Sequence, residues 1–172
     1  MHVLLCGISG VGKTTLAKQL SKDFGLICST SSDDIHTWIR KNFGFLGQGE
    51  LDINSPEYKI TQLITKVYQQ VEILLQSRRK NMVIDAANQT EKIRSRIAKL
   101  LPEKPIIIYI TCNQEELYHR LQNRDNPEVW LELHLKQKTS FEPPENPDII
   151  YNTSTDSYEY VKHQIALRGK NK

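Results

Sequence analysis

The stretch Gly7-Ile8-Ser9-Gly10-Val11-Gly12-Lys13-Thr14, near the start of the chain, has the spacing G-x-x-x-x-G-K-[ST]. The apolar run Val3-Leu4-Leu5-Cys6 precedes it and predicts a buried strand. Leu16, Leu20 and Phe24 follow at i, i+4 spacing, which predicts a helix packed on that strand. A glycine-rich turn between a strand and a helix is the setting in which this spacing binds a nucleoside triphosphate. The alternative is a chance glycine-rich turn.

The residue types of this loop fit the wrapping of a polyphosphate by backbone N–H groups. The glycines allow a tight path, and the following helix N-terminus favours negative charge. We expect Lys13 to reach the β- and γ-phosphates and Thr14 to place its hydroxyl on Mg²⁺. The residues expected to bind the nucleotide here are Gly7, Ser9, Gly10, Val11, Gly12, Lys13, Thr14 and Thr15.

Composition sets few further limits. The 172 residues suffice for one domain with a sizeable core, and a net charge of +3 permits a polyanionic partner without demanding one. Cys6, Cys28 and Cys112 are odd in number and widely spaced, which argues against a disulfide framework and favours small buried side chains in a reducing compartment. The N-terminal apolar run is too short for a signal peptide or a membrane span. We therefore expect a cytoplasmic protein without a membrane partner.

An acidic pair follows the second predicted strand, Leu26–Thr30. This places Asp33 or Asp34 at the carboxyl end of a strand, the edge where ligands bind in open α/β sheets. One of the two acids is expected to cap the helix that begins here, and the other is a candidate catalytic group. On that helix Asp33, His36 and Arg40 would share one face.

A third predicted strand, Asn81–Asp85, also ends in an acid. Asp85 is expected to hold Mg²⁺ directly or through water, as the companion of the phosphate-binding loop. Asn88 is either a ligand-binding residue or a turn residue, and Thr90 is expected to cap the next helix.

Between these strands we predict a loop over residues 44–54 that covers the substrate, and then a long helix after Pro56. The basic triplet Arg78-Arg79-Lys80 suits the negative C-terminus of that helix better than nucleic-acid binding. The residues expected to form the core stripe of the helix are Leu63, Ile64, Val67, Val71, Leu74 and Leu75.

The fourth predicted strand, Pro105–Ile110, is followed by a helical stretch with Arg120 and Arg124 at i, i+4 spacing on one face. Two arginines here are expected to clamp transferring phosphates as part of a lid over residues 114–141. The alternative is a solvated face on which they pair with Glu116 or another acid.

The last predicted strand, Asp148–Asn152, leads into the turn Thr153–Thr155. Backbone groups there could hold an adenine ring, and we include Asn152 among the expected nucleotide-binding residues. Strands that alternate with helices predict an α/β fold with a parallel sheet of about five strands and right-handed crossovers. We expect residues 1–172 to form a single domain.

Taken together, five motifs resemble the P-loop kinases related to phage-type polynucleotide 5′-hydroxyl kinases, the group of AAA-like kinase domains. These motifs are Gly7–Thr14, Ser31–Asp34, Ile84–Asn88, the pair Arg120 and Arg124, and Phe141–Pro144. The resemblance implies a P-loop NTPase fold and transfer of the γ-phosphate of ATP to a hydroxyl. It implies Asp33 as the general base, and Lys13, Thr14, Arg120 and Arg124 as phosphate and metal ligands.

The resemblance also implies an acceptor site, in which this sequence departs from the family. The family has an arginine three residues after the catalytic aspartate, where this chain has His36, and Arg40 could substitute one helical turn later. The expected acceptor-binding residues are thus Asp33, His36, Arg40 and Asn88. The expected acceptor is the 5′ end of DNA or RNA. Alternatives are a small-molecule kinase, or a nucleotide-dependent switch, against which the absence of an N-K-x-D motif speaks.

Overall fold

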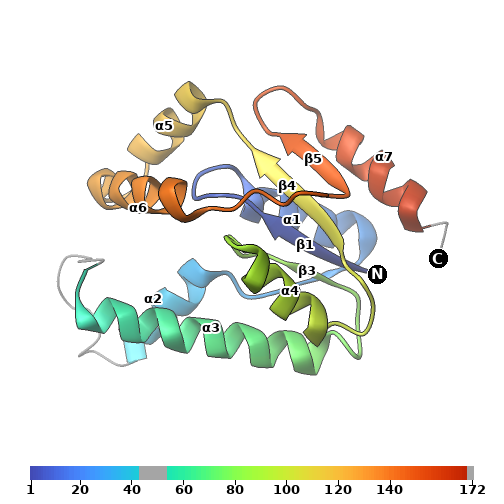
Figure 1. Ribbon diagram of the computed structural model, residues 1–172, viewed down its shortest axis with the longest axis horizontal. Helices are drawn as coiled ribbons and strands as arrows, with labels where there is room; N and C mark the ends of the chain where they lie inside the picture. Colours follow the sequence, from blue (N-terminus) through green and yellow to red (C-terminus); the bar gives the residue numbers. More distant parts are fainter. Residues whose placement is uncertain (43–53, 170–172) are drawn as a thin grey trace.

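The computed structural model describes residues 1–42 and 54–169 (Figure 1). Its centre is a parallel sheet of five strands in the order β2-β3-β1-β4-β5. The strands are β1 (His2–Cys6), β2 (Ile27–Cys28), β3 (Met82–Ile84), β4 (Ile106–Thr111) and β5 (Ile149–Asn152). The predicted α/β fold with a five-stranded parallel sheet is therefore confirmed.

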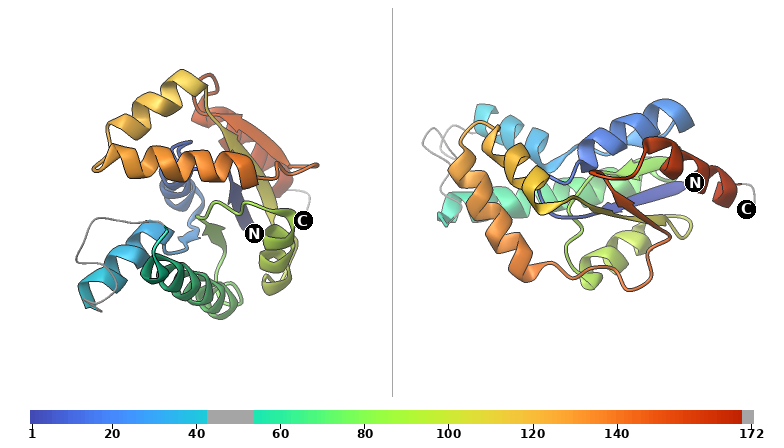
Figure 2. Two further views of the ribbon diagram at one scale, coloured as in Figure 1. Left: turned by 60° about the vertical axis from the view of Figure 1, so that its left-hand side comes forward. Right: turned by 90° about the horizontal axis from the view of Figure 1, so that it is seen from above.

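The helices cover both faces of the sheet, so the central strand β1 is buried over its whole length. Alternate residues of β1 point to opposite faces: Leu5 packs with side chains of α1, α5 and α7, whereas Leu4 packs with side chains of α3 and α4. Figure 2 shows α1 and α7 on one side of the sheet and α4 on the other. The helices are α1 (Lys13–Phe24), α2 (Ser32–Asn42), α3 (Pro56–Gln76), α4 (Glu91–Leu100), α5 (Gln114–Gln122), α6 (Pro127–Ser140) and α7 (Tyr158–Gly169).

Local signals explain where several helices begin. Ser55 caps α3 by accepting a hydrogen bond from the Tyr58 amide, and Pro56 takes the first helical position, where no N–H is needed. Thr90 caps α4 through the Ile93 amide, as predicted. These caps satisfy amides that the first turn leaves without helical partners.

The predicted core stripe of α3 is wrong. The stripe points outward: Leu63 and Leu75 are each 63% exposed, and the buried positions of the helix are Thr61, Thr65 and Ile73. The physical reason is that the opposite, polar face of α3 is needed inside the molecule, where it contacts the start of α2 and lines a pocket. The spacing revealed an apolar stripe but carried no information on which side the sheet would lie.

Two further expectations need correction. The second strand is shorter than predicted, Ile27–Cys28, although the Ser29 amide still donates to the Val83 carbonyl at 2.9 Å. Helix α5 ends at Gln122, so Arg124 lies in the turn before α6 and does not share a helical face with Arg120. Two predictions stay open. The loop predicted over residues 44–54 lies outside the described residues, except for Asn54. The single domain over residues 1–172 also stays a prediction.

In the described part of the chain, no helix is long and apolar enough to cross a membrane. The three cysteines are free, and Cys6 is buried. Burial raises the pKa of the Cys6 thiol to about 12 and that of the Cys28 thiol to about 11, so both are neutral at pH 7. Cys6 is thus a small buried side chain as expected, whereas Cys28 and Cys112 are only partly buried.

Candidate active site

The glycine-rich loop connects β1 to α1, as its spacing predicts. Gly10 (φ 88°) and Gly12 (φ 98°) adopt left-handed conformations that residues with a side chain rarely adopt. A Cβ at Gly10 would also lie 2.6 Å from Cδ1 of Leu117 on α5. The glycines therefore allow the path of the loop and the close approach of α5 to it.

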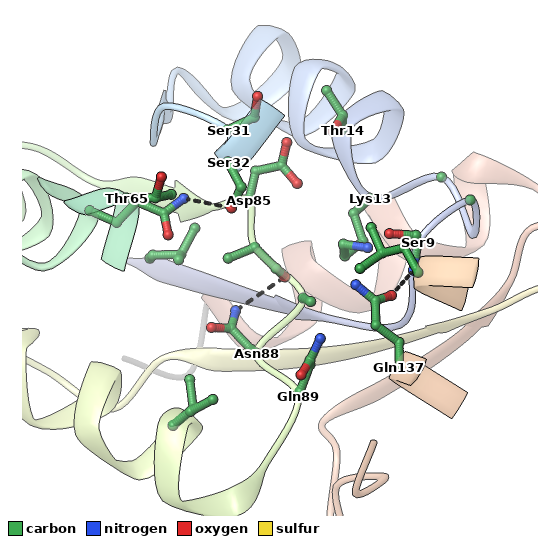
Figure 3. A pocket seen from close by; sticks show the side chains of 18 of the residues that line it. Ser9, Lys13, Thr14, Ser31, Ser32, Thr65, Asp85, Asn88, Gln89 and Gln137 are labelled. Atoms are coloured by element: carbon green, nitrogen blue, oxygen red, sulfur yellow. Dashed lines mark hydrogen bonds between the residues drawn. The ribbon is translucent and has the colours of Figure 1, made fainter. Parts of the chain in front are cut away.

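Side chains from two elements hold the loop in place. The Lys13 ammonium donates to the Ile8 carbonyl at 2.7 Å. The Ser9 amide donates to Oε1 of Gln137, which comes from α6, at 2.6 Å (Figure 3). The Gln137 oxygen thus accepts a hydrogen bond from a loop amide of the kind that binds phosphate oxygens in such loops. Gln137 could not be predicted as a site residue, because a glutamine in a polar helix carries no distinguishing spacing.

Asp85 directly follows β3, and only 3% of its surface is exposed. Its amide donates to Oγ of Ser29 at 2.9 Å. Figure 3 shows Asp85 between the Lys13–Thr14 end of the loop and Ser31 and Ser32 at the start of α2. The Thr14 hydroxyl and the Asp85 carboxylate line the same pocket and are the oxygen donors that Mg²⁺ prefers, together with phosphates and water. The oxygen atoms of Thr14 and Asp85 are therefore suitable ligands for Mg²⁺. That the protein binds this ion stays a prediction.

Asn88 has φ 46° and is 4% exposed, so it occupies a strained turn. Its Nδ2 donates to the Leu5 carbonyl at 2.6 Å, which ties the end of β1 to the connection after β3. The turn role considered for Asn88 is thus present in the structure. Its role as an acceptor ligand stays a prediction, although the residue lines the pocket.

The acidic pair at the start of α2 separates into two roles. Oγ of Ser31 donates to Oδ2 of Asp34 at 2.7 Å and accepts from the Asp34 amide at 3.2 Å. Asp34 therefore belongs to the helix cap, which leaves Asp33, the second residue of α2, as the candidate base. The side chains of Asp33 and Arg40 lie outside the described residues, so their predicted functions remain untested.

His36, one helical turn after Asp33, lines the pocket. Its ring meets the Tyr58 ring of α3 edge-on, with centroids 5.8 Å apart. The P-loop kinases that the sequence resembles have an arginine at this position, whereas here the His36 imidazole packs against the Tyr58 ring.

Helix α3 supports the start of α2 through its polar face. The Glu72 carboxylate accepts from the Thr30 amide at 3.0 Å and from its hydroxyl at 2.9 Å. Nε2 of Gln69 donates to the Thr30 carbonyl at 3.1 Å and to Oγ of Ser32 at 3.3 Å. Because these bonds hold the last residues before α2, they position the segment that carries Asp33. Gln69 and Glu72 were not among the predicted site residues, because the spacing in α3 drew attention only to its apolar residues.

The lid consists of α5 and α6, which pack against each other. Nη1 of Arg120 donates to Oγ1 of Thr153 at 2.9 Å, and that hydroxyl donates to the Val11 carbonyl at 3.1 Å. Arg120 also forms an ion pair with Glu116 at 2.9 Å, so the alternative pairing is present as well. The Arg124 guanidinium lies 4.3 Å from the ring centroid of Trp130, a cation–π contact. Both arginines line the pocket, the position expected of a lid.

The turn after β5 borders the loop from the other side. Thr153 lies beside Gly12, where a Cβ would be 3.4 Å from Cγ2 of the threonine. Nδ2 of Asn152 donates to Oδ1 of Asn113 at 3.2 Å, and Oδ1 of Asn152 accepts from the Ser154 amide at 3.0 Å. Asn152 thus shapes the turn, and its nucleotide-binding role stays a prediction.

These elements enclose one pocket of about 810 Å³ (Figure 3). Among its described lining residues, the only carboxylate is that of Asp85, so the pocket favours a polyanion. The cationic residues of the lining are Lys13, Lys66, Arg96, Arg120, Arg124 and Lys136.

A glycine-rich phosphate loop at the carboxyl edge of a parallel sheet, beneath an arginine-bearing lid, defines a P-loop kinase fold. The chain belongs to an AAA domain family, whose model matches residues 3–144. No curated protein matches the sequence.

Solved kinase structures share the fold at low sequence identity. The APS kinase of Mycobacterium tuberculosis, in complex with AMPPNP and APS, is 13% identical with a TM-score of 0.64, covering 98% of this chain and 96% of its own. The gluconokinase of Sinorhizobium meliloti is 14% identical with a TM-score of 0.57, and the match covers 95% of this chain and 87% of the gluconokinase. The shikimate kinase of Acinetobacter baumannii, in complex with shikimate, is 18% identical with a TM-score of 0.56, covering 99% and 94%.

Proposed function

We propose that the protein is an ATP-dependent kinase that transfers the γ-phosphate to a hydroxyl of a small molecule carrying an anionic group. The observation that carries this proposal is the wall of the pocket opposite the phosphate loop. There the polar face of α3, with Thr65 and Gln69, meets Ser31 and Ser32 of the α2 start. The APS kinase, gluconokinase and shikimate kinase named above support a small acceptor over a polynucleotide end.

The chemistry of this wall suits a polyhydroxylated acid. Hydroxyl and amide side chains both donate and accept hydrogen bonds, so they match several hydroxyl groups of an acceptor. Lys66 of α3 and Arg96 of α4 add exposed positive charges at the rim of the same wall. A carboxylate, sulfate or phosphate on the acceptor would pair with them.

The proposed reaction is an in-line transfer. Asp33 orients the acceptor hydroxyl and accepts its proton, while Lys13 holds the β- and γ-phosphates. Thr14 and Asp85 would hold Mg²⁺, which, when bound, neutralises charge on the phosphate oxygens. Arg120 and Arg124 stabilise the transferring group from the lid side and, with α6, exclude water.

An acceptor panel tests the proposal. The purified protein, Mg²⁺ and γ-labelled ATP are offered hydroxy acids, sugar acids, neutral sugars, nucleosides and oligonucleotides with 5′-hydroxyl ends, with a no-acceptor control. We expect label on a small hydroxy acid, and a weaker signal on its neutral analogue. Label on oligonucleotide ends would instead support the polynucleotide 5′-hydroxyl kinase that the sequence resembles. Hydrolysis of ATP with every acceptor unlabelled would favour a nucleotide-dependent switch.

Removal of the rim charges should affect acceptor binding more than turnover. Lys66→Ala and Arg96→Ala are each expected to raise KM for the acceptor about 10-fold at nearly constant kcat, because a hydrogen bond to a charged group contributes on the order of 1.5 kcal/mol. Lys59→Ala and Lys92→Ala are matched controls, since these lysines are exposed on the same two helices but do not line the pocket. Equal KM values for all four variants would refute an anion site at this rim.

A further inference from the structure

The outward face of α3 is apolar from Ile60 to Leu75. Its exposed side chains include Val67, which is 55% exposed near the middle of the helix. Figure 1 shows α3 along the outer edge of the molecule. Apolar patches of this extent on a protein surface mark interaction sites. The exposed apolar residues of this face are Ile60, Leu63, Ile64, Val67, Tyr68, Val71, Leu74 and Leu75.

The spacing of these residues is that of a helix–helix seam. Ile60, Ile64, Val67, Val71 and Leu74 are separated by steps of four, three, four and three residues. This alternation is the average period of about 3.5 residues at which two α-helices pack along a shared stripe. The remaining three apolar residues flank this stripe and widen it, so the face has the pattern of a helix that packs against another helix.

The protein itself does not use this face among the residues that the structure describes. The contacts of α3 run through its other side, where Glu72 and Gln69 hold Thr30, and where Ile73 packs in the core cluster with Leu4. The described helices that contact α3 most are α2 and α4.

We propose that this face binds the same face of a second copy of the chain, with the two α3 helices antiparallel and the two-fold axis at Val67. A self-complementary stripe is what a two-fold dimer requires, since each copy presents the same patch. Eight large side chains, about half exposed each, amount to several hundred Å² of apolar surface. That is on the order of the roughly 800 Å² that each partner contributes to a standard interface.

The charges at the two ends of α3 select the antiparallel arrangement. Glu57 lies in the first turn, three residues before Ile60 and so on the side of the apolar stripe, whereas Lys59 of that turn is rotated by about 100° from Ile60. Arg78, Arg79 and Lys80 follow the last turn. A two-fold axis at Val67 brings the first turn of one helix opposite the end of the other, so acid and base meet twice. A parallel pair would instead place the two basic triplets side by side, which is unfavourable.

The first test is the molar mass in solution, by light scattering after size exclusion, of the full chain and of two variants. We expect the unmodified protein to be a dimer and Val67→Glu to be a monomer at the same concentration, because two carboxylates would face each other at the axis. Leu167→Glu is the matched control: Leu167 is 47% exposed on α7, at the opposite edge of the molecule, and this variant should remain dimeric. Circular dichroism confirms that each variant is folded.

A mixing experiment tests the position of the axis. Val67→Glu and Val67→Lys are each expected to be monomeric alone and to form a mixed dimer when combined, because opposite charges then meet at the axis. A monomeric unmodified protein would overturn the proposal and leave the face to another partner. A dimer that survives Val67→Glu would place the interface elsewhere, and failure of the mixed pair would refute the axis at Val67.

Discussion

Lys13→Ala should lower the rate of phosphoryl transfer roughly 10²–10³-fold, the cost of removing one group that stabilises developing charge in a site shielded from water. It should also weaken ATP binding, because Lys13 is the first residue of α1 and stands at the end of the loop that wraps the phosphates. Initial rates with labelled ATP and calorimetric titration with a non-hydrolysable analogue measure the two effects.

Lys18→Ala is the matched control for this experiment. Lys18 is exposed on the same helix but does not line the pocket, so its loss should leave both quantities nearly unchanged. The Lys13 ammonium now donates to the Ile8 carbonyl, so its removal also frees a loop contact. Thermal unfolding of the unliganded variant separates that structural effect from lost binding. Unchanged ATP affinity in a folded Lys13→Ala protein would contradict the assigned role.

The sheet and the phosphate loop could be predicted because their signals are local. A β-branched run such as Ile106–Ile110 is apolar on both faces, and only a strand covered on both sides needs that. The glycine spacing of Gly7–Thr14 likewise specifies its own backbone path. Both features follow from residues that are neighbours in the chain.

The orientation of α3 could not be predicted, because an amphipathic pattern has two faces. Burial is usually assigned to the apolar one, and here the protein buries Thr61 and Thr65 and leaves Leu63 outside. What reverses the usual choice is a tertiary demand, namely that Glu72 and Gln69 must reach the residues before α2. That demand joins positions some forty residues apart and has no local signature.

The same limit explains which of the residues that line the pocket could be predicted from the sequence. Asp85 directly follows β3, and the carboxyl edge of a parallel sheet gathers such residues in one place. Arg120 lies on α5, the helix after β4. Gln137 and Thr153 reach the loop from α6 and from the turn after β5, and their contacts depend on how the lid packs. Helix caps are an intermediate case. The sequence predicts that Asp33 or Asp34 caps α2, and the hydrogen bonds between Ser31 and Asp34 show that Asp34 takes part.

That distinction leads to a paired prediction for the two acids. Asp33→Asn should lower the transfer rate by on the order of 10²–10⁴-fold, the size of general-base assistance, and leave ATP affinity nearly intact. Asp34→Asn should keep most of the activity and lower the free energy of unfolding by about 1 kcal/mol, since it weakens a helix cap. Both variants replace an aspartate by asparagine, at adjacent positions of α2, so each is the control for the other.

Rate and stability measurements on both variants separate the two roles. Because the amide in Asp33→Asn can still accept a hydrogen bond from the acceptor hydroxyl but cannot take its proton, the loss should appear in kcat with the acceptor KM little changed. It should persist at high pH, since an amide does not become a base there. If Asp34→Asn lost the activity and Asp33→Asn kept it, the base would be Asp34 and the assignment of Asp33 as the base would be wrong. Loss in neither would mean that the acceptor hydroxyl is deprotonated without a carboxylate from α2.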